Sequence, residues 1–427
     1  MCHFTLAALA VLAASGASFA QSTVTLFGGA DINYRSVTSG TNKFQGMAQD
    51  GIYSSRFGVM GTEDLGGGLK AGFHFEGGMN PDTGTPGGFN FARKSTVGVM
   101  GGFGEVRMGR DYTPLFTVHG IADPFGTNGV GSSGNLLFST VGVSADPISA
   151  QAAADAAGTF VTANRGNQTT TAPSAVSAAN VPASFTYADP GAVRYNNSIT
   201  YYAPTISGFS ASAMYSFGVE NTNTQKKAGT GTSLRLGYAA GPLTVAFANQ
   251  VTKGGDAGAL NTAAAASLQP LGATCSAGAV NATATTQQCL SAASTGTAAT
   301  EDQKWTTNFL AGSYDLGVAR LSAGMKNEKL SGGGDDGKIK STVLGVSAPM
   351  GALTLKATYI TKKVDSEKAG TQTAVGGVYD LSKRTSVYAT YATLKNEAGF
   401  GNVVGSAVAS TGGVTSKGFE LGVKHNF

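Results

Sequence analysis

The sequence has few charged residues, no long apolar run and almost no cysteine. Charged residues make up 13% of the 427-residue chain, against roughly 25% in a typical soluble domain. The formal net charge is only +4 and no dense Lys/Arg cluster occurs, so no nucleic-acid partner is predicted. No run of about 18 apolar residues occurs either, which excludes a transmembrane helix.

Residue patterns typical of enzymes and metalloproteins are missing as well. The histidines lie far apart and show no metal-ligand spacing: His3, His74, His119 and His425. The sequence contains neither a P-loop nor a G-x-S-x-G nucleophile elbow. We therefore predict no metal, no cofactor and no enzymatic activity.

The three cysteines do not form a disulfide framework. Cys2 lies in the N-terminal segment, whereas Cys275 and Cys289 share one Ala/Thr/Ser-rich stretch. In an oxidising compartment the latter two could close a small loop as a disulfide. Two unpaired thiols are the alternative.

The first 20 residues resemble a secretory signal peptide. Residues 4–14, FTLAALAVLAA, form an apolar run that is too short to span a bilayer, and small residues follow up to Ala20. The segment before this run lacks Lys and Arg, which departs from the usual pattern. We predict a signal peptide over 1–20 and a single domain over 21–427, and the alternative is a buried helix.

What the sequence does contain is strand-like alternation with a period of two. In residues 69–76, Leu69, Phe73 and Phe75 fall on one face and Lys70 falls on the other. Similar segments recur from Val24 to the C-terminus. This alternation is typical of half-buried strands.

The connections alternate between short and long. Short turns rich in Gly, Pro and Asp are predicted at residues 64–68, 101–104, 203–208, 240–242, 315–317, 349–352 and 380–384. Long loops are predicted at residues 39–50, 80–88, 112–193, 254–304 and 397–416. Short periplasmic turns and long external loops are typical of outer-membrane barrels.

Counting strands between these connections gives about five before residue 112 and about eleven after it. The sum, roughly 16, is even, as antiparallel closure requires. We therefore predict an all-β fold, a transmembrane antiparallel β-barrel whose last strand pairs with its first. Low-complexity insertions lie in 112–193 and 254–304. A soluble β-protein is the alternative.

Several stretches resemble the general porins of beta-proteobacteria. They are STVTLFGGAD at 22–31, SSRFGVMGTEDLGGGLK at 54–70, GEVRMGRDYTP at 104–114, RYNNSITYYAPTISGF at 194–209 and LGVKHNF at 421–427. The resemblance spans nearly the whole mature chain, although the long loops match no pattern.

The resemblance implies a homotrimer of 16-stranded barrels in the outer membrane of a Gram-negative bacterium. Each barrel would be a water-filled pore for small hydrophilic solutes and ions, narrowed where the third external loop folds into the lumen. Outer-membrane lipid and lipopolysaccharide would surround the barrel. Phe427 would be part of the signal read by the barrel-assembly machinery.

The resemblance also points to basic residues at the constriction. Arg56 and Arg194 match wall arginines of the family, Arg110 matches a third, and Arg93 and Lys94 match a basic pair. Alternation places Arg56 in the lumen, and places Arg194 there too because its parity is opposite to that of Tyr195. For Arg93 and Lys94, both can face the lumen only if a bulge or a strand end lies near Arg93.

The acidic side of the constriction is predicted in the loop. Residues 121–126 resemble a loop tip in which an acidic residue and the turn Pro124, Phe125, Gly126 face the arginines. Asp123 and Asp111 would supply negative charge. The basic candidates outnumber these two, so we expect a general diffusion pore that prefers anions. A solute-specific channel and a barrel adhesin that displays long loops are the alternatives.

Overall fold

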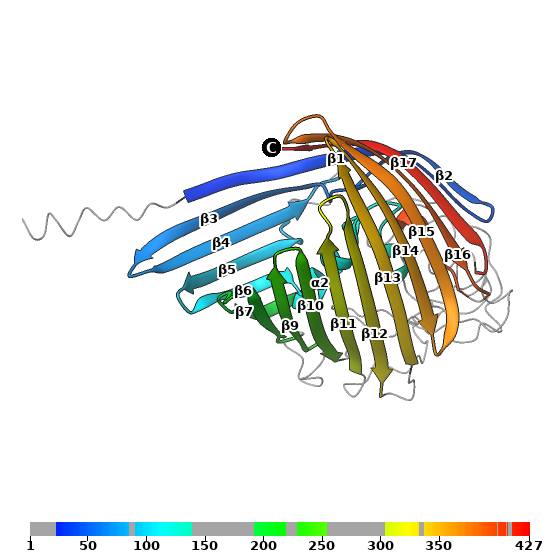
Figure 1. Ribbon diagram of the computed structural model, residues 1–427. Coiled ribbons are helices and arrows are strands. Elements are labelled where there is room, and N and C mark those ends of the chain that lie inside the picture. Colours follow the sequence, from blue (N-terminus) through cyan, green and yellow to red (C-terminus); the bar gives the residue numbers. More distant parts are fainter. Residues whose placement is uncertain are drawn as a thin grey trace, which may run out of the picture.

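The computed structural model describes residues 23–84, 90–138, 192–218, 229–253, 304–332, 337–398, 400–406, 408 and 412–427. Figure 1 shows a single antiparallel sheet that curls into a barrel, with helix α2 inside it. Among these residues, no helix is long and apolar enough to cross a membrane.

The strands before the constriction loop are β1 Thr23–Ser39, β2 Asn42–Gln49, β3 Arg56–Gly66, β4 Leu69–Gly78, β5 Lys94–Gly101 and β6 Gly104–Tyr112. Those after it are β7 Arg194–Tyr202, β8 Phe209–Ser216, β9 Gly231–Ala240, β10 Leu243–Lys253, β11 Lys304–Asp315, β12 Arg320–Ser331, β13 Gly337–Met350, β14 Leu353–Val364, β15 Glu367–Asp380, β16 Thr385–Asn396 and β17 Thr415–Asn426. The helices are α2 Pro114–Ala122, α3 Gly134–Leu137 and the 3₁₀ turn η1 Val404–Ser406.

The barrel closes between β1 and β17, which pair from Gly29 opposite Asn426 to Ser39 opposite Ser416. On its other side, β1 pairs first with β3 and then with β2. Strands β2 and β3 therefore lie end to end in one wall position, so the 17 described segments fill 16 positions. Closure joins the two ends of the sheet, as a spanning sheet in lipid requires. Among the described strands, β2 pairs with β1 alone, and the first five residues of β1 pair with β3 alone.

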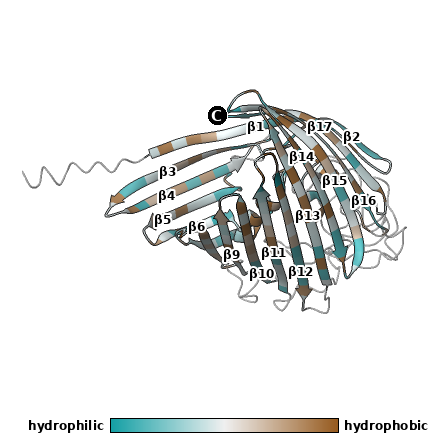
Figure 2. Ribbon diagram, in the orientation of Figure 1, coloured by the Kyte–Doolittle hydropathy of each residue, from teal (hydrophilic) through white to brown (hydrophobic). Residues whose placement is uncertain are grey.

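Side chains alternate between lipid and lumen along each strand. In β12, Leu321 and Met325 are exposed on the outer face, whereas Lys326 and Glu328 are buried on the inner face. Figure 2 shows apolar and polar residues alternating along β12 and β13. The exposed apolar side chains suit a lipid-facing band, because lipid takes the place that a protein core takes in a soluble fold.

The structure confirms the predicted barrel, and strands meet at each of the seven predicted short turns. The predicted loop at 39–50 was wrong: Asn42–Gln49 forms β2, which pairs with the second half of β1. The alternating exposure of β2 shows that the polar composition of this segment hid a strand. The helices α2 and α3 within 112–193 were not expected either.

Several predictions lie outside the described residues. They concern the signal peptide at 1–20 with its mature start at Gln21, most of the insertion in 112–193, nearly all of 254–304, and the Cys275–Cys289 pair. These remain predictions.

The last residue contributes directly to closure. The Phe427 N–H donates to the Gly28 carbonyl at 3.0 Å, and the Gly28 N–H donates to the Phe427 carbonyl at 3.2 Å. The Phe427 ring also lies against Gly28, where a Cβ would come within 2.7 Å of it. Phe427 therefore joins the two ends of the sheet.

We predict that deleting Phe427 reduces the amount of barrel assembled in the outer membrane, because both of these backbone hydrogen bonds are lost. Heat-modifiable migration of membrane fractions on gels measures folded barrel. Phe419→Leu, on the outer face of the same strand, is the control and should assemble normally. Any Phe427-deleted pores should keep the ion preference of the parent, and wild-type assembly of this variant would contradict the prediction.

Candidate pore constriction

The constriction loop follows β6 and begins with helix α2, which lies inside the barrel. Thr113 caps this helix, since its Oγ1 accepts the Phe116 N–H at 3.2 Å, and Pro114 occupies the first turn, where no N–H is needed. The helix packs against β9–β12. The Leu115 N–H also donates to Ser233 Oγ of β9 at 3.2 Å. These contacts fix the start of the loop on the inner wall.

His119 lies at the centre of this contact and is 1% exposed. Its ring lies 4.6 Å from that of Phe138 and 4.5 Å from that of Phe309, measured between centroids. Neither ring nitrogen has a hydrogen-bond partner among the described residues. Burial, with a smaller contribution from nearby Lys326, holds the pKa of His119 well below its ordinary value of 6.5. The imidazole is therefore neutral at physiological pH.

The loop tip docks on the wall formed by β13 and β15. Pro124 lies against Gly345, where an added Cβ would be 2.6 Å from the Pro124 Cδ, and Phe125 lies against Gly376. The Gln372 side chain donates to the carbonyls of Gly131 at 3.2 Å and Ser132 at 2.8 Å. Glycine is needed at both wall positions because a side chain would displace the tip.

Asp123 organises this tip. Its Oδ1 accepts the Phe125 N–H at 2.9 Å, and its Oδ2 accepts the N–H groups of Thr127 at 3.2 Å and Ser133 at 2.8 Å. The residue is 3% exposed. Burial raises the pKa of Asp123 above its usual range, although these hydrogen bonds act in the opposite direction.

The predicted orientation of the tip was therefore wrong. Pro124 and Phe125 face β13 and β15, and the Asp123 carboxylate faces the backbone of its own turn. Gly126 adopts a φ of 67°, which the turn requires. The physical reason is that an apolar ring and a proline gain more by burial against the glycines of the wall than by facing an aqueous pore.

Beyond the tip, the loop reaches β17 and β1. Glu420 accepts the Val130 N–H at 3.2 Å and pairs with Arg35 at 3.1 Å. Asp31 of β1 accepts the N–H groups of Ile52 at 2.8 Å and Tyr53 at 2.9 Å. These buried carboxylates anchor both the loop and the 50–55 segment, so the loop covers β9–β17 and leaves the β3–β7 wall open.

Arginines gather on this open wall. Arg56 of β3 lies 3.4 Å from Glu76 Oε1, and Arg93 lies 2.7 Å from the same oxygen. Arg93 and Arg194 both donate to the Tyr112 hydroxyl. The Arg194 guanidinium lies 4.1 Å from the centroid of the Tyr112 ring, a cation–π distance. We call Arg56, Arg93 and Arg194 the arginine cluster, and it includes three of the five basic residues predicted from the sequence.

Arg194 faces the constriction, as predicted, but the reason given for it was wrong, because Tyr195 does not face lipid. Tyr195 is 5% exposed, on the inner face, whereas Ile199 is exposed. The register between β6 and β7 shifts between Gly109 and Asp111, and Asn197 has a φ of 46°. This bulge changes the facing of the residues that precede it. Arg194 enters the cluster because it begins the strand and bends toward Tyr112.

The regular alternation of β6 keeps Arg110 out of the cluster, because Met108 on the same side is 58% exposed and Asp111 on the other side is buried. Arg110 pairs with Ser95, on the side of the sheet where Val97 is 54% exposed. Its guanidinium donates to the Ala92 carbonyl and to Asn196 Oδ1, both at 2.5 Å. The predicted placement of Arg110 beside Arg56 and Arg194 was therefore wrong.

Arg93 lies just before β5 begins. Because strict alternation does not hold at this strand end, Arg93 and Lys94 can both face the lumen, as expected. Lys94 faces inward and lies 3.2 Å from Asp111 Oδ1. Asp111 also pairs with Arg107 at 3.3 Å, and Arg107 pairs with Glu105 at 2.6 Å. This second group holds two cations and two carboxylates, so its charges balance. Asp111 is 2% exposed and compensates Lys94 and Arg107 rather than the arginine cluster.

Besides Arg35, Arg107 and the buried Lys326 and Lys362, further basic residues that the sequence analysis missed share the inner face. They are Arg235, Arg320, Lys356 and Lys424. The signal was present, since Arg235 lies between Leu234 and Leu236, which are 53% and 63% exposed on the outer face.

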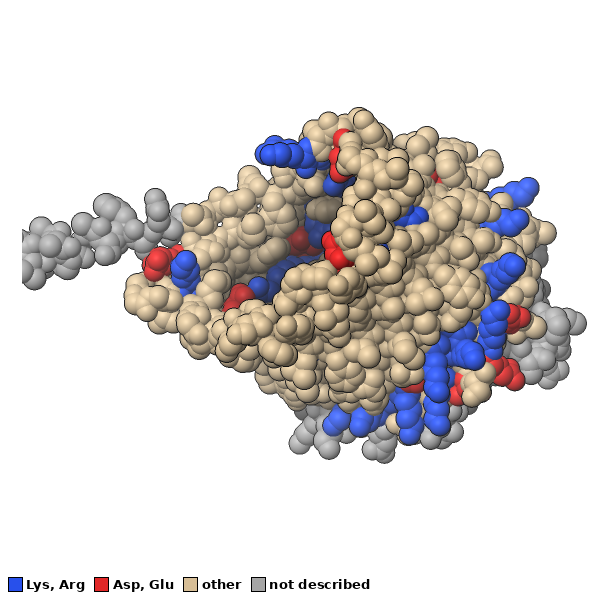
Figure 3. Space-filling model, viewed as in Figure 1, with Lys and Arg blue, Asp and Glu red and all other residues tan. Residues whose placement is uncertain are grey.

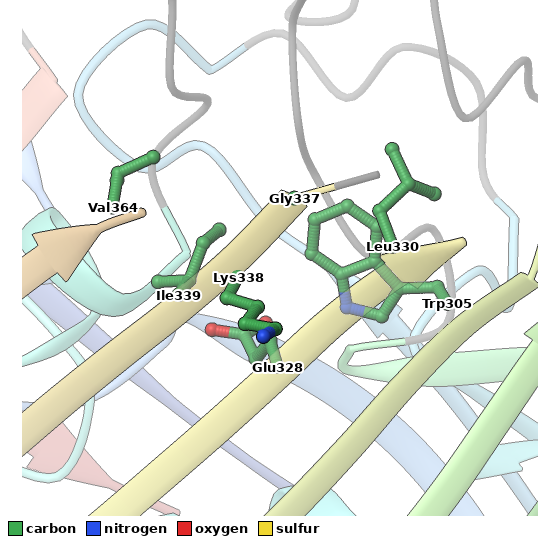
Figure 4. Close-up of a pocket in the computed structure, with 7 residues that line it drawn as sticks. All are labelled: Trp305, Glu328, Leu330, Gly337, Lys338, Ile339 and Val364. Atoms are coloured by element: carbon green, nitrogen blue, oxygen red, sulfur yellow. The ribbon is translucent and has the colours of Figure 1, made fainter. Parts of the chain in front are cut away.

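The lumen wall also contains an apolar part. Figure 4 shows Trp305, Leu330, Ile339 and Val364, which come from β11–β14. They belong to a buried cluster that Ala369 and Phe400 complete. Below it, buried Lys326 and Glu328 pair at 3.0 Å. This part of the wall is packed, and buried Lys362 lies close to both Lys326 and Glu328. Figure 3 shows basic and acidic side chains inside the hollow of the barrel.

Comparison with known proteins places this geometry in context. A sequence profile described as "Gram-negative porin" matches residues 5–341 and 290–399. Outer membrane porin protein 32 of Delftia acidovorans is 32% identical, and the match covers 99% of each protein. An outer membrane porin protein of Bordetella pertussis is 27% identical over 99% of each.

A solved structure is similar as well. The structure described as an anion-selective porin from Comamonas acidovorans superposes with a TM-score of 0.69 at 28% identity. The match covers 95% of this chain and 100% of that one.

We predict that acidification weakens the barrel through His119. Its pKa is lowered in the folded state, so the unfolded state binds the proton more readily and stability falls as pH drops below about 6.5. The loss is at most about 1.4 kcal/mol per pH unit. His119→Phe keeps an aromatic ring and removes the titration.

The measurement is the temperature at which the barrel unfolds in detergent, between pH 7.5 and pH 5. The drop should be smaller for His119→Phe than for the parent. Equal drops in the two proteins would show that His119 does not contribute to the pH dependence.

Proposed function

Because this chain belongs to the Gram-negative porin family, we propose that it is a general diffusion porin whose constriction prefers anions. Family membership identifies the protein as a non-enzymatic channel located in the outer membrane of a Gram-negative bacterium. The preference for anions and the identity of the groups that produce it are the proposal.

The observation that carries the proposal is the charge of the open wall. The cluster holds three guanidinium groups and one carboxylate: Arg56 and Arg93 flank Glu76, and Arg194 shares the Tyr112 hydroxyl with Arg93. This leaves an excess of two positive charges beside the passage that the loop does not cover. The neighbouring group of Lys94, Arg107, Glu105 and Asp111 adds no net charge.

The hydrogen bonds of these arginines use only some of their N–H donors and hold the guanidinium groups in place. Glu76 and Tyr112 hold the guanidinium groups by some of their donors, and each guanidinium has five N–H donors. The remaining donors favour anionic and polar solutes. The Debye length is about 8 Å at physiological salt, so salt screens the field of these groups only weakly for a solute that passes within that distance.

Two further observations support the preference for anions. Lys356, Lys424, Arg235 and Arg320 add basic groups to the inner face of other strands. In addition, the structural relative at 28% identity is described as anion-selective.

We also propose that the protein is a homotrimer, as is typical of this family. Lipid and lipopolysaccharide would cover the exposed apolar band, and the barrel-assembly machinery would recognise the C-terminal strand that ends in Phe427. Crosslinking of the folded protein in detergent, read as the mass of the complex, tests the trimer.

We predict opposite shifts in ion selectivity for two kinds of variant. Glu76→Gln should raise the chloride-to-potassium permeability ratio, whereas the double variant R56Q/R93Q should lower it. Two unit charges about 4 Å apart in water interact by about 1 kcal/mol. One charge should therefore change the ratio by about fivefold.

Reversal potential across a tenfold gradient of KCl in a planar bilayer measures the ratio. The control is K340Q/K363Q, which removes the same charge as R56Q/R93Q from the exposed outer face of β13 and β14. This control should leave the ratio unchanged. A cation-selective parent, or equal shifts in R56Q/R93Q and K340Q/K363Q, would refute the assignment.

A further inference from the structure

The guanidinium groups of the arginine cluster are held in two different ways, and Arg56 is held by the barrel wall. Its Nε donates to the Ser54 carbonyl at 2.9 Å, and its Nη1 lies 3.4 Å from the Glu76 carboxylate. Its guanidinium also lies 4.3 Å from the centroid of the Tyr53 ring. The wall strand β4 and the segment just before β3 therefore supply the groups that hold Arg56.

Arg194 depends on Tyr112 instead. Its guanidinium donates to the Tyr112 hydroxyl and lies 4.1 Å from the centroid of the same ring. In the part of the chain that the structure describes, no carboxylate lies within ion-pair distance of Arg194. The Arg194 Nε is buried and has no hydrogen-bond partner among those residues. One neutral side chain thus holds this cation, through its hydroxyl and through its ring.

The Tyr112 hydroxyl also accepts a second guanidinium. Arg93 donates to it at 2.7 Å and keeps a separate contact with Glu76, also at 2.7 Å. Two cations that share one oxygen lie close together and repel each other. Without the hydroxyl, we expect Arg93 to stay with Glu76. Arg194 has no carboxylate to stay with, so repulsion should move it away from the passage.

The constriction loop fixes the Tyr112 ring. This ring stacks on that of Phe116, with the centroids 5.1 Å apart and the planes inclined by 15°. Phe116 belongs to helix α2, and on the helix side its ring lies near those of His119 and Phe138, with centroids 6.0 Å and 6.1 Å away. Because α2 packs against β9–β12, the stack relates the position of Tyr112 to the docking of the helix on the far wall.

We propose that Tyr112 is a positioning residue that sets the strength of the anion preference without carrying a charge. It holds Arg194 beside the open passage and makes that position depend on helix α2. The loop then acts on selectivity through a neutral side chain, since the Asp123 carboxylate faces the backbone of its own turn. This inference rests on the proposed function, because it concerns the same passage.

The test uses variants that leave the formal charge unchanged. Tyr112→Phe removes the hydroxyl and keeps the ring, whereas Tyr112→Leu removes both. The matched control is Tyr202→Phe, whose ring lies 4.6 Å from the Arg107 guanidinium on the same inner wall. Arg107 keeps two contacts with the Glu105 carboxylate, at 2.6 Å and 2.8 Å, so the lost hydroxyl should not move it. Reversal potential across a tenfold gradient of KCl in a planar bilayer measures the permeability ratio, and single-channel conductance shows that each pore is folded.

We expect Tyr112→Phe to lower the chloride-to-potassium permeability ratio about twofold and Tyr112→Leu about threefold, which is less than the effect of about fivefold expected for one whole charge. Tyr202→Phe should keep the ratio of the parent. Arg194→Gln should lower the ratio about fivefold. Adding Tyr112→Phe to Arg194→Gln should change it little further, because the group that the hydroxyl positions is already gone.

Phe116→Leu tests the link to the helix. It removes the stacked ring from α2 and leaves the charge of the protein unchanged. The permeability ratio should fall when Phe116→Leu is introduced into the parent. It should not fall further in the Tyr112→Leu background, where the ring that transmits the position of the helix is absent. Equal falls in both backgrounds would contradict the coupling.

An unchanged ratio in Tyr112→Phe would contradict the positioning role, whichever ion the parent prefers. The same holds for an equal fall in Tyr202→Phe, which would indicate a general effect of losing a lumen hydroxyl. A full twofold fall on adding Tyr112→Phe to Arg194→Gln would show that Tyr112 does not act through Arg194. A cation-selective parent would instead refute the proposed function, and a fall of the ratio in Tyr112→Phe would then still support the role of Tyr112.

Discussion

The rest of this structure depends on the need to pair every backbone N–H and C=O group within a wall that faces lipid. The sheet meets this need by closing β1 on β17, and the carbonyl and N–H of Phe427 complete the pairing at Gly28. Closure turns one face of every strand toward lipid and the other toward water. The outer apolar band and the charged lumen are therefore two consequences of one constraint.

The lumen acquires its selectivity from what the loop covers. Tight docking of Pro124 and Phe125 on Gly345 and Gly376 holds the loop over one side of the barrel. On that side Lys326 and Glu328 are buried and paired, and buried Lys362 lies beside them. The opposite side stays open and retains an excess of arginine around Glu76. The packing of the loop thus decides which charged side chains are buried and which line the open passage.

The outer surface has its own charge pattern. The exposed lysines at the loop end continue the apolar faces of the same strands, and several of them oppose one another across the sheet. A soluble protein would gain nothing from such an arrangement, because like charges in register repel. In this barrel the lysines extend the lipid-facing side of the wall toward the loops.

The sequence by itself determined the barrel, because alternation with a period of two and the short turns are local patterns that closure requires. It also indicated Arg56, whose neighbours alternate without interruption. It could not determine the facing of Tyr195, since a bulge at Asn196 and Asn197 of β7 reverses parity without any clear local signal. Nor could it place Asp123 and Phe125, whose burial depends on glycines more than 200 residues away, Gly345 and Gly376. Local chemistry decides which residues form strands, and only the closed tertiary structure decides which charges remain without compensation beside the pore.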